Sequence, residues 1–417
     1  MTILFLILIL ILAFISTPVF SLISALTFFL FYKDNIDISA AIIELMRLSS
    51  LPSLIAIPLF IFSGYILAYS KAPQRMFNLA NSLLGSITGG IAIASLAAAA
   101  IFTAFTGASG ITIIALGGLI YPILIKQGYS EKFSLGLVTT TGSLGLLFPP
   151  SLPIILYAIV GKLDLNLLFK SAFPPGIILL IILSIYSFYS AKKLKIQKKK
   201  FDISKLKESI KATIWEIPLP FIIIGGIYKG IFTASEAASI MAFYVIIVEI
   251  FIYKDLNLFK DVPEILIKSM MLVGAIFMVL GTALGFTNYI IDAQLPDKLF
   301  NWLNSFISSK TVFLLILNIF LLLINMIEIF SAIIIVVPII VPVAINYGID
   351  PYHLGIIFLL NLELGYMTPP LGLNLFLSSM RFEKPLTQIY KNVWIYWLIV
   401  FSTLILITYF PKLIFIK

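Results

Sequence analysis

The stretch YPILIKQGYSEKFSLGLVTTTGSLGLLFPPSLP at residues 121–153 has a counterpart, VPVAINYGIDPYHLGIIFLLNLELGYMTPPLGL, at residues 341–373. The two align without a gap at an offset of 220 residues. The matched residues are Pro122 with Pro342, Gly128 with Gly348, Gly145 with Gly365, Pro149 with Pro369 and Pro150 with Pro370. Five matches in one register indicate an internal repeat.

Each copy contains the pattern Gly-x-x-x-Pro-Pro. Proline removes a backbone donor and clashes with the preceding turn, so two in succession stop a helix. The carbonyls and amides freed in this way survive in a bilayer only inside protein or beside a watery cavity. A single Pro-Pro pair favours a kinked structural helix. Two matched pairs beside polar residues favour an ion or substrate site.

The composition places this pattern in a membrane. The 417 residues are 61% hydrophobic and 11% charged, against about 45–50% and about 25% in soluble domains. The chain has no cysteine, which excludes disulfides and iron–sulfur clusters, and its one histidine makes a histidine-built metal site improbable. No nucleotide-binding glycine-rich loop is present, which argues against a primary pump, and we expect no organic cofactor.

The distribution of basic residues predicts which side of the membrane the loops face. Nine of the 28 Lys and Arg residues lie in the segment 191–212, which contains no RNA-binding motif. A cytoplasmic loop beside an anionic leaflet is therefore favoured over a nucleic-acid site. Residues 1–20 have no basic residue ahead of their apolar run, so we expect a retained first helix and not a signal peptide.

The repeat and the loop predict the organisation of an all-α polytopic membrane protein. The first repeat covers 1–190, the basic loop 191–212 and the second repeat 213–417. The first repeat holds a hairpin at about 86–126 and a broken helix at about 133–160, and the second holds a hairpin at about 306–346 and a broken helix at about 350–377. An odd number of predicted crossings separates the copies, which is typical of the inverted repeats of secondary transporters. The amphipathic segments 36–50 and 256–268 are expected to be either interfacial arms or contact surfaces for another subunit.

Polar residues gather at the same breaks and hairpin turns. Ionisable residues within a span are functional candidates by default, and Glu328 and Glu363 fit that argument best, with a locally capped carboxylate as the alternative. Hydroxyls, amides and free carbonyls suit Na⁺, and half-helix N-termini suit an anion. Na⁺ is preferred over H⁺ because few buried carboxylates are available as proton carriers. Ser109, Ser143 and Thr368 are the candidate Na⁺ ligands.

Four further motifs carry a resemblance that extends over essentially the whole chain. They are GGIYKGIFTASEAA at 225–238, IPLFIFSGYIL at 57–67, SLGLLFPPS at 143–151 and ELGYMTPPLGLNLF at 363–376. Together with the Gly-Ala-Ser-Gly turn at 107–110, they resemble the large membrane subunit (DctM-like) of tripartite ATP-independent periplasmic (TRAP) transporters.

The resemblance implies a Na⁺-driven elevator of the ion-transporter superfamily, in the bacterial inner membrane. The implied fold has two re-entrant helical hairpins and two discontinuous helices. It also implies two partners: a separate four-helix membrane subunit, and a periplasmic receptor that delivers an organic acid such as a C4-dicarboxylate or sialic acid. The candidate ion- or substrate-binding residues, from the resemblance and from the polar positions, are Gly107, Ser109, Gly110, Gly142, Ser143, Gly145, Pro149, Pro150, Ser151, Glu328, Glu363, Gly365, Thr368, Pro369, Pro370 and Asn374. Ala108 departs from the serine that the family often has there, and the residues before Glu328 lack the usual glycine.

Other readings stay open at this point. A sodium–dicarboxylate symporter of the same superfamily would work without a receptor. The Gly-x-Ser-Gly turn at Ser109 also fits a rhomboid-like intramembrane serine protease, whose general base would have to be His353. Arg381 follows the second break and is either an anchor on the cytoplasmic side or a partner for a substrate carboxylate.

Overall fold

The computed structural model describes residues 5, 7–9, 11, 12, 17–49, 52–198, 200–324 and 329–414, and these form helices and no strands. The first half contains α2 (Val19–Lys33), α3 (Ser39–Ser49), α4 (Ala56–Tyr69), α5 (Ala72–Leu84), α6 (Gly90–Thr106), α7 (Ser109–Thr112), α8 (Gly118–Lys126), α9 (Glu131–Leu144), α10 (Leu152–Val160) and α11 (Leu165–Lys193). The second half contains α12 (Ile203–Ala212), α13 (Pro218–Tyr228), α14 (Ala234–Ile246), α15 (Asp261–Asp292), α16 (Leu295–Asn304), α17 (Lys310–Ile324), α18 (Ile329–Asn346), α19 (Pro351–Tyr366), α20 (Leu373–Phe382) and α21 (Leu386–Tyr409). Short 3₁₀ or π segments join some of them: η1 (Pro52–Ile55), η2 (Ile113–Gly117), η3 (Gly145–Leu147), η4 (Ile247–Ile252) and η5 (Pro411–Leu413).

The helix boundaries recur at an offset close to 220 residues. Helix α8 ends at Lys126 and α18 at Asn346, while α9 begins at Glu131 and α19 at Pro351. The N-caps recur too, because Ser130 accepts a hydrogen bond from the Phe133 amide and Asp350 accepts from the Tyr352 and His353 amides. A side-chain acceptor at this position satisfies amides that the first helical turn leaves free. Both copies therefore start this helix in the same way.

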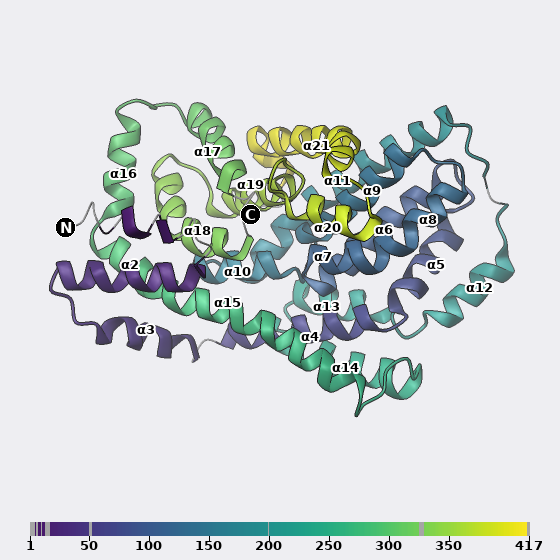
Figure 1. Ribbon diagram of the computed structural model, residues 1–417, viewed down its shortest axis with the longest axis horizontal. Coiled ribbons are helices and arrows are strands. Elements are labelled where there is room, and N and C mark those ends of the chain that lie inside the picture. Colours follow the sequence, from purple (N-terminus) through teal and green to yellow (C-terminus); the bar gives the residue numbers. More distant parts are fainter. Residues whose placement is uncertain are drawn as a thin grey trace.

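Two groups of helices pack mainly within themselves. In Figure 1, α2 and α3 lie along α15, with α4 and α14 beside its start, and this group forms one side of the molecule. The other group holds α6 to α11 and α17 to α21, in which α9 packs on α21 and α6, and α19 packs on α17 and α21. Helices α4 and α15 contact members of the second group, so the two groups share an interface.

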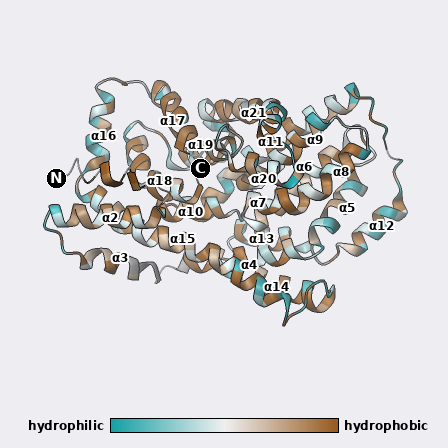
Figure 2. Ribbon diagram, viewed as in Figure 1, coloured by the Kyte–Doolittle hydropathy of each residue, from teal (hydrophilic) through white to brown (hydrophobic). Residues whose placement is uncertain are grey.

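The helices suit a membrane. In the described part of the chain, six helices are long and apolar enough to cross a membrane. The number is seven if the bent pair formed by Glu131–Leu147 and Leu152–Val160 is one span. Figure 2 shows hydrophobic colours along most helices and hydrophilic patches on α12 and α16. The segment 191–212 contains α12, which has no buried residue, so the basic segment is not wholly a loop.

Two amphipathic helices stand immediately before the hairpin regions. Helix α5 precedes α6, and α16 precedes α17. The segments 36–50 and 256–268, which are predicted to be amphipathic, contain α3 and the start of α15. The broken second helix also continues to Phe382, beyond the expected end near residue 377.

Candidate functional site

The first helical hairpin turns at Gly107. This residue has φ 63°, a left-handed conformation that favours glycine, and it ends α6. Ser109 then begins α7 and is buried. Across the turn, the Thr103 and Thr112 hydroxyl oxygens lie 2.8 Å apart, and both side chains are buried. The turn at residues 107–110 is therefore held inside protein. Gly110 lies against α20, where an added Cβ would come within 2.8 Å of Leu377 Cδ1.

The first break follows the buried polar run 139–143 at the end of α9. The chain bends by 42° between the helix ending at Leu147 and the helix starting at Leu152. Pro149 and Pro150 lie in the non-helical link, as expected from the double proline. The Ser151 hydroxyl donates to the Leu146 carbonyl at 2.6 Å across this link. Ser151 thus caps a backbone carbonyl, which is a structural role.

The end of α9 meets the second half of the other broken helix. Asn374, near the start of α20, donates through Nδ2 to the Thr139 carbonyl and to the Ser143 hydroxyl, each at 3.2 Å. One turn on, the Ser378 hydroxyl lies 2.8 Å from the Thr139 hydroxyl. We call Thr139, Ser143, Asn374 and Ser378 the polar junction. All four are fully buried, and the Asn374 Oδ1 has no hydrogen-bond partner among the described residues.

The glycines of the first break permit this close packing. At Gly142, an added Cβ would lie 2.5 Å from Ile113 Cγ1 and 3.1 Å from the Ser109 carbonyl oxygen. At Gly145, it would lie 2.4 Å from Thr103 Cβ and 2.5 Å from the Ala104 nitrogen. The hairpin turn, the end of α9 and α20 are thereby brought together around the polar junction.

The second break contacts a different neighbour. The Thr368 hydroxyl donates to the Leu364 carbonyl at 2.7 Å and accepts from the Trp397 indole at 2.8 Å. The Pro370 carbonyl accepts from the Tyr390 hydroxyl at 3.1 Å, and Pro369 and Pro370 are exposed. Trp397 and Tyr390 belong to α21. Thr368 is therefore held by α21, and its hydrogen bonds do not join it to Ser109 or Ser143.

Glu363 has an unusual environment in α19. Its side chain is fully buried, and neither carboxyl oxygen has a hydrogen-bond partner among the described residues. Asn361 bonds Asn318 at 2.7 Å, and Asn318 in turn bonds Thr408 at 3.2 Å. Two residues turn a helix by about 200°, so Glu363 projects from the other side of α19. Gly365 is buried one turn from the break, while Glu328 lies outside the described residues.

The structure contains a buried cluster of charged side chains that was not predicted from the sequence. Arg75 of α5 pairs with Glu216, Glu249 and Asp255, and its guanidinium carbon lies 3.9 Å from the centroid of the Tyr253 ring. The Tyr253 hydroxyl donates to Glu216 at 2.8 Å. Burial raises the pKa of Glu216, against the opposing effect of the Arg75 charge. Glu249 interrupts the apolar run 245–252 and so meets the criterion that singled out Glu363, whereas its partner was not visible in the sequence.

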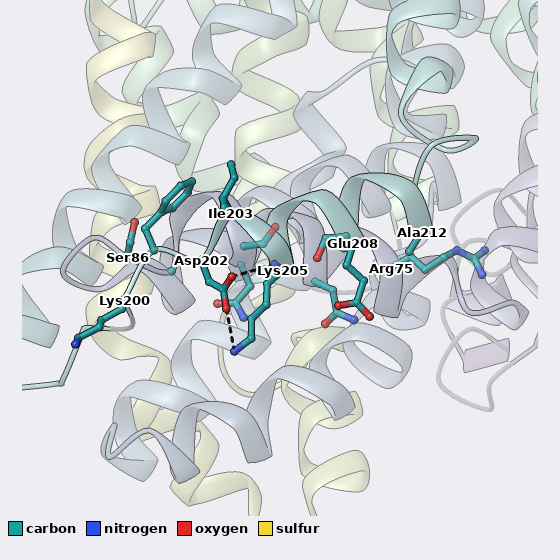
Figure 3. Close-up of a pocket in the computed structure, with 14 residues that line it drawn as sticks. Arg75, Ser86, Lys200, Asp202, Ile203, Lys205, Glu208 and Ala212 are labelled. Atoms are coloured by element: carbon teal, nitrogen blue, oxygen red, sulfur yellow. Dashed lines mark hydrogen bonds and ion pairs between the residues drawn. The ribbon is translucent and has the colours of Figure 1, made fainter.

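A pocket of about 920 Å³ lies between α5 and α12, away from the helix breaks. Figure 3 shows Asp202 and Lys205 meeting within it and Arg75 at its edge. Asp202 also caps α12, through the Ser204 and Lys205 amides. The lining carries both signs of charge and includes none of the site residues expected from the sequence.

His353 does not serve Ser109. Its ring nitrogen Nε2 lies 2.9 Å from the Ile407 carbonyl of α21, and the side chain is 2% exposed. Ser109 lies in the hairpin turn, beside Gly142 and Ile113. A serine protease needs its base within hydrogen-bond reach of the nucleophile, and these contacts give no support to that reading.

The comparisons with known proteins agree with the resemblance. A family model described as the DctM component of the tripartite ATP-independent periplasmic transporter matches residues 3–413. The chain is 36% identical over 391 residues to the C4-dicarboxylate TRAP transporter large permease protein DctM of Pseudomonas aeruginosa, covering 93% of this chain and 90% of that protein. It is 33% identical over 401 residues to the Rhodobacter capsulatus protein of the same name, covering 92% and 91%.

In structure, the chain is similar to the YdaH transporter of Alcanivorax borkumensis, known from a crystal structure. The TM-score is 0.60 at 12% sequence identity, over 86% of this chain and 85% of that one. This likeness concerns the fold alone. The two curated relatives are transporter permeases, so the chain is a multi-pass transport protein of the bacterial inner membrane and not an enzyme. It belongs to the DctM family of tripartite ATP-independent periplasmic transporters.

Proposed function

We propose that this protein imports an organic acid, coupled to Na⁺, after a periplasmic substrate-binding protein has delivered it. A small four-helix membrane subunit completes the system. The observation that carries the proposal is the polar junction, where the end of α9 meets the start of α20 through Asn374. C4-dicarboxylates are the first substrates to test because the two relatives described above are named for them.

Na⁺ coupling is supported by the donors at this junction. Asn374 Oδ1 is buried without a partner, and the Ser143 hydroxyl and Thr139 carbonyl lie beside the same side chain. Oxygen ligands of this kind are those that broken transporter helices offer to Na⁺. Glu363 is a further candidate ligand, because a cation has to balance the charge of its buried carboxylate whenever that group is ionised. We assign Ser143 and Asn374 to ion binding, and Ser109 to the adjoining turn.

The division of the helices into two groups supports a proposal for how the protein moves. The hairpins and broken helices fall in one group, and α2, α3, α4, α14 and α15 make up the other. We propose that the first group is a transport domain that slides against the second as an elevator, with α5 and α16 as the connecting arms. The repeated helix boundaries support two copies of one unit, and the predicted crossings place these copies in inverted orientation.

The test is uptake into proteoliposomes that contain this protein and its small subunit. Labelled succinate and N-acetylneuraminate would each be offered with a Na⁺ gradient or an equal K⁺ gradient, and with or without the cognate receptor. We expect uptake only with Na⁺ and receptor together. Receptor-independent uptake driven by Na⁺ would instead identify a self-sufficient symporter, and uptake equal in K⁺ would refute sodium coupling.

A further inference from the structure

Arg381 lies on the side of α20 that faces the first hairpin. It follows Asn374 by seven residues and Ser378 by three, so the three side chains share one helical face. Asn374 and Ser378 contact α9 within the polar junction. Three residues beyond Arg381, Lys384 pairs with Glu131 at the start of α9. Arg381 therefore stands between a surface ion pair and the buried junction.

The guanidinium is held in place by the second arm of the hairpin. Its Nε donates to the Ile114 carbonyl at 2.9 Å, within the π-helical segment η2. Such one-turn π segments are frequent at functional sites. The head group also lies across Gly118, where an added Cβ would come within 2.2 Å of Nη2. A hydrogen bond and a close approach thus fix the orientation of the side chain.

The remaining donors are available. Arg381 is exposed, and among the described residues the Ile114 carbonyl is its sole hydrogen-bond partner, with no ion pair. A guanidinium has five N–H donors, of which Nε uses one. The two Nη groups can bind one carboxylate at two points, a geometry that gives strength and specificity. An anchoring role in the membrane surface would require neither the bond to Ile114 nor the space at Gly118.

We propose that Arg381 is a substrate-recognition residue, which binds an acidic group of the transported anion at the edge of the polar junction. This inference rests on the proposed function, and it names carboxylate-bearing anions as the class of substrate. Lys126, which is exposed at the end of α8, is the matched control for a cation that only anchors the protein.

The experiment measures binding without the receptor. The purified complex with its small subunit is heated in the presence of Na⁺ and rising succinate or N-acetylneuraminate, and the ligand-induced rise of the unfolding temperature gives the dissociation constant. Arg381→Gln should weaken binding of the acid roughly 10- to 100-fold, with an unchanged unfolding temperature in the absence of ligand. Arg381→Lys should be intermediate because charge remains and the two-point geometry is lost. Lys126→Gln should bind like the wild type.

Each other outcome has a definite meaning. Unchanged affinity in Arg381→Gln, or equal weakening in Lys126→Gln, would overturn the inference and leave the proposed function standing. A lower ligand-free unfolding temperature with the wild-type dissociation constant would show that Arg381 only supports the hairpin. A wild-type protein that neither binds nor imports either acid would overturn the proposed function, and the inference with it.

Discussion

Ser143 is the residue whose contribution to ion binding is simplest to isolate. Its hydroxyl accepts from Asn374 at 3.2 Å and lies 3.4 Å from the Thr140 carbonyl. Ser143→Ala removes one oxygen that can bind Na⁺ from a buried site, and it adds no volume. A lost hydrogen-bonding group of this kind costs about 1 kcal/mol, so we expect the Na⁺ concentration for half-maximal uptake to rise roughly fivefold.

Ser187→Ala provides the comparison. Ser187 is equally buried, and its hydroxyl donates within α11 to the Leu183 carbonyl at 2.9 Å. Its loss should leave the Na⁺ dependence of uptake unchanged. If Ser143→Ala gave the same Na⁺ curve as the wild type, Ser143 would not be an ion ligand.

Among the packing elements, the contact between η3 and α6 depends on Gly145. An added Cβ would meet Thr103 Cβ at 2.4 Å and the Ala104 nitrogen at 2.5 Å, and backbone atoms cannot simply move aside. Overpacking of this kind typically costs about 1–3 kcal/mol. Gly145→Ala should therefore lower the unfolding temperature of the purified protein. Gly225→Ala, in α13 with nothing within 4 Å of the added Cβ, is the control that should not.

The ion cluster links α5 to the chain around α13 and η4. Arg75→Gln leaves Glu216, Glu249 and Asp255 without their guanidinium, a loss on the order of 3 kcal/mol for a buried pair. The pKa of Glu216 is already raised by burial, and removing the Arg75 charge raises it further. A carboxyl group with a higher pKa in the folded chain than in the unfolded chain stabilises less as pH rises between the two values.

The deficit in unfolding temperature of Arg75→Gln should therefore grow between pH 5 and pH 8. Lys71→Gln is the control, because its ammonium is 3.9 Å from Asp255 and its side chain is 79% exposed. Exposed pairs of this kind contribute at most about 1 kcal/mol. A deficit in Arg75→Gln that shrank with rising pH would contradict the assignment of charge in the cluster.

The sequence predicts some of these elements well. The double prolines at 149–150 and 369–370 coincide with the two breaks, and the spacing of apolar runs gives the hairpin region that ends at Lys126. A double proline alone does not decide a break, because Pro174 and Pro175 lie inside α11. The contact of Asn374 with Ser143 joins residues 231 apart, and no local pattern encodes such a pair. Arg75 and its acids were missed for the same reason. Thr368 was grouped with Ser143 because both are polar residues near breaks, but neighbouring α21 holds its hydroxyl.

At the scale of the whole molecule, a close contact between α4 and α6 crosses the interface along which an elevator would have to slide. Gly64 of α4 faces the end of α6, where an added Cβ would lie 2.5 Å from Thr106 Cα and 2.6 Å from the Phe105 carbonyl oxygen. This clash resembles the one at Gly145, except that Gly145 and Thr103 both belong to the proposed transport domain. Gly64 and its neighbours Phe105 and Thr106 instead lie on opposite sides of the interface between the two groups of helices.

The two substitutions should consequently behave differently. If the domains slide, Gly64→Ala destabilises the arrangement of domains seen here but not the shifted arrangement. More molecules then adopt the shifted arrangement, and the fold survives. A difference of about 1.4 kcal/mol changes the ratio of the two arrangements tenfold. We expect slower uptake, an unfolding temperature close to that of the wild type, and altered maleimide labelling of a cysteine introduced at Ser109. The chain has no native cysteine, so the label reports that position alone. A rigid molecule would make Gly64→Ala as destabilising as Gly145→Ala, with unchanged labelling, and the elevator would then be excluded.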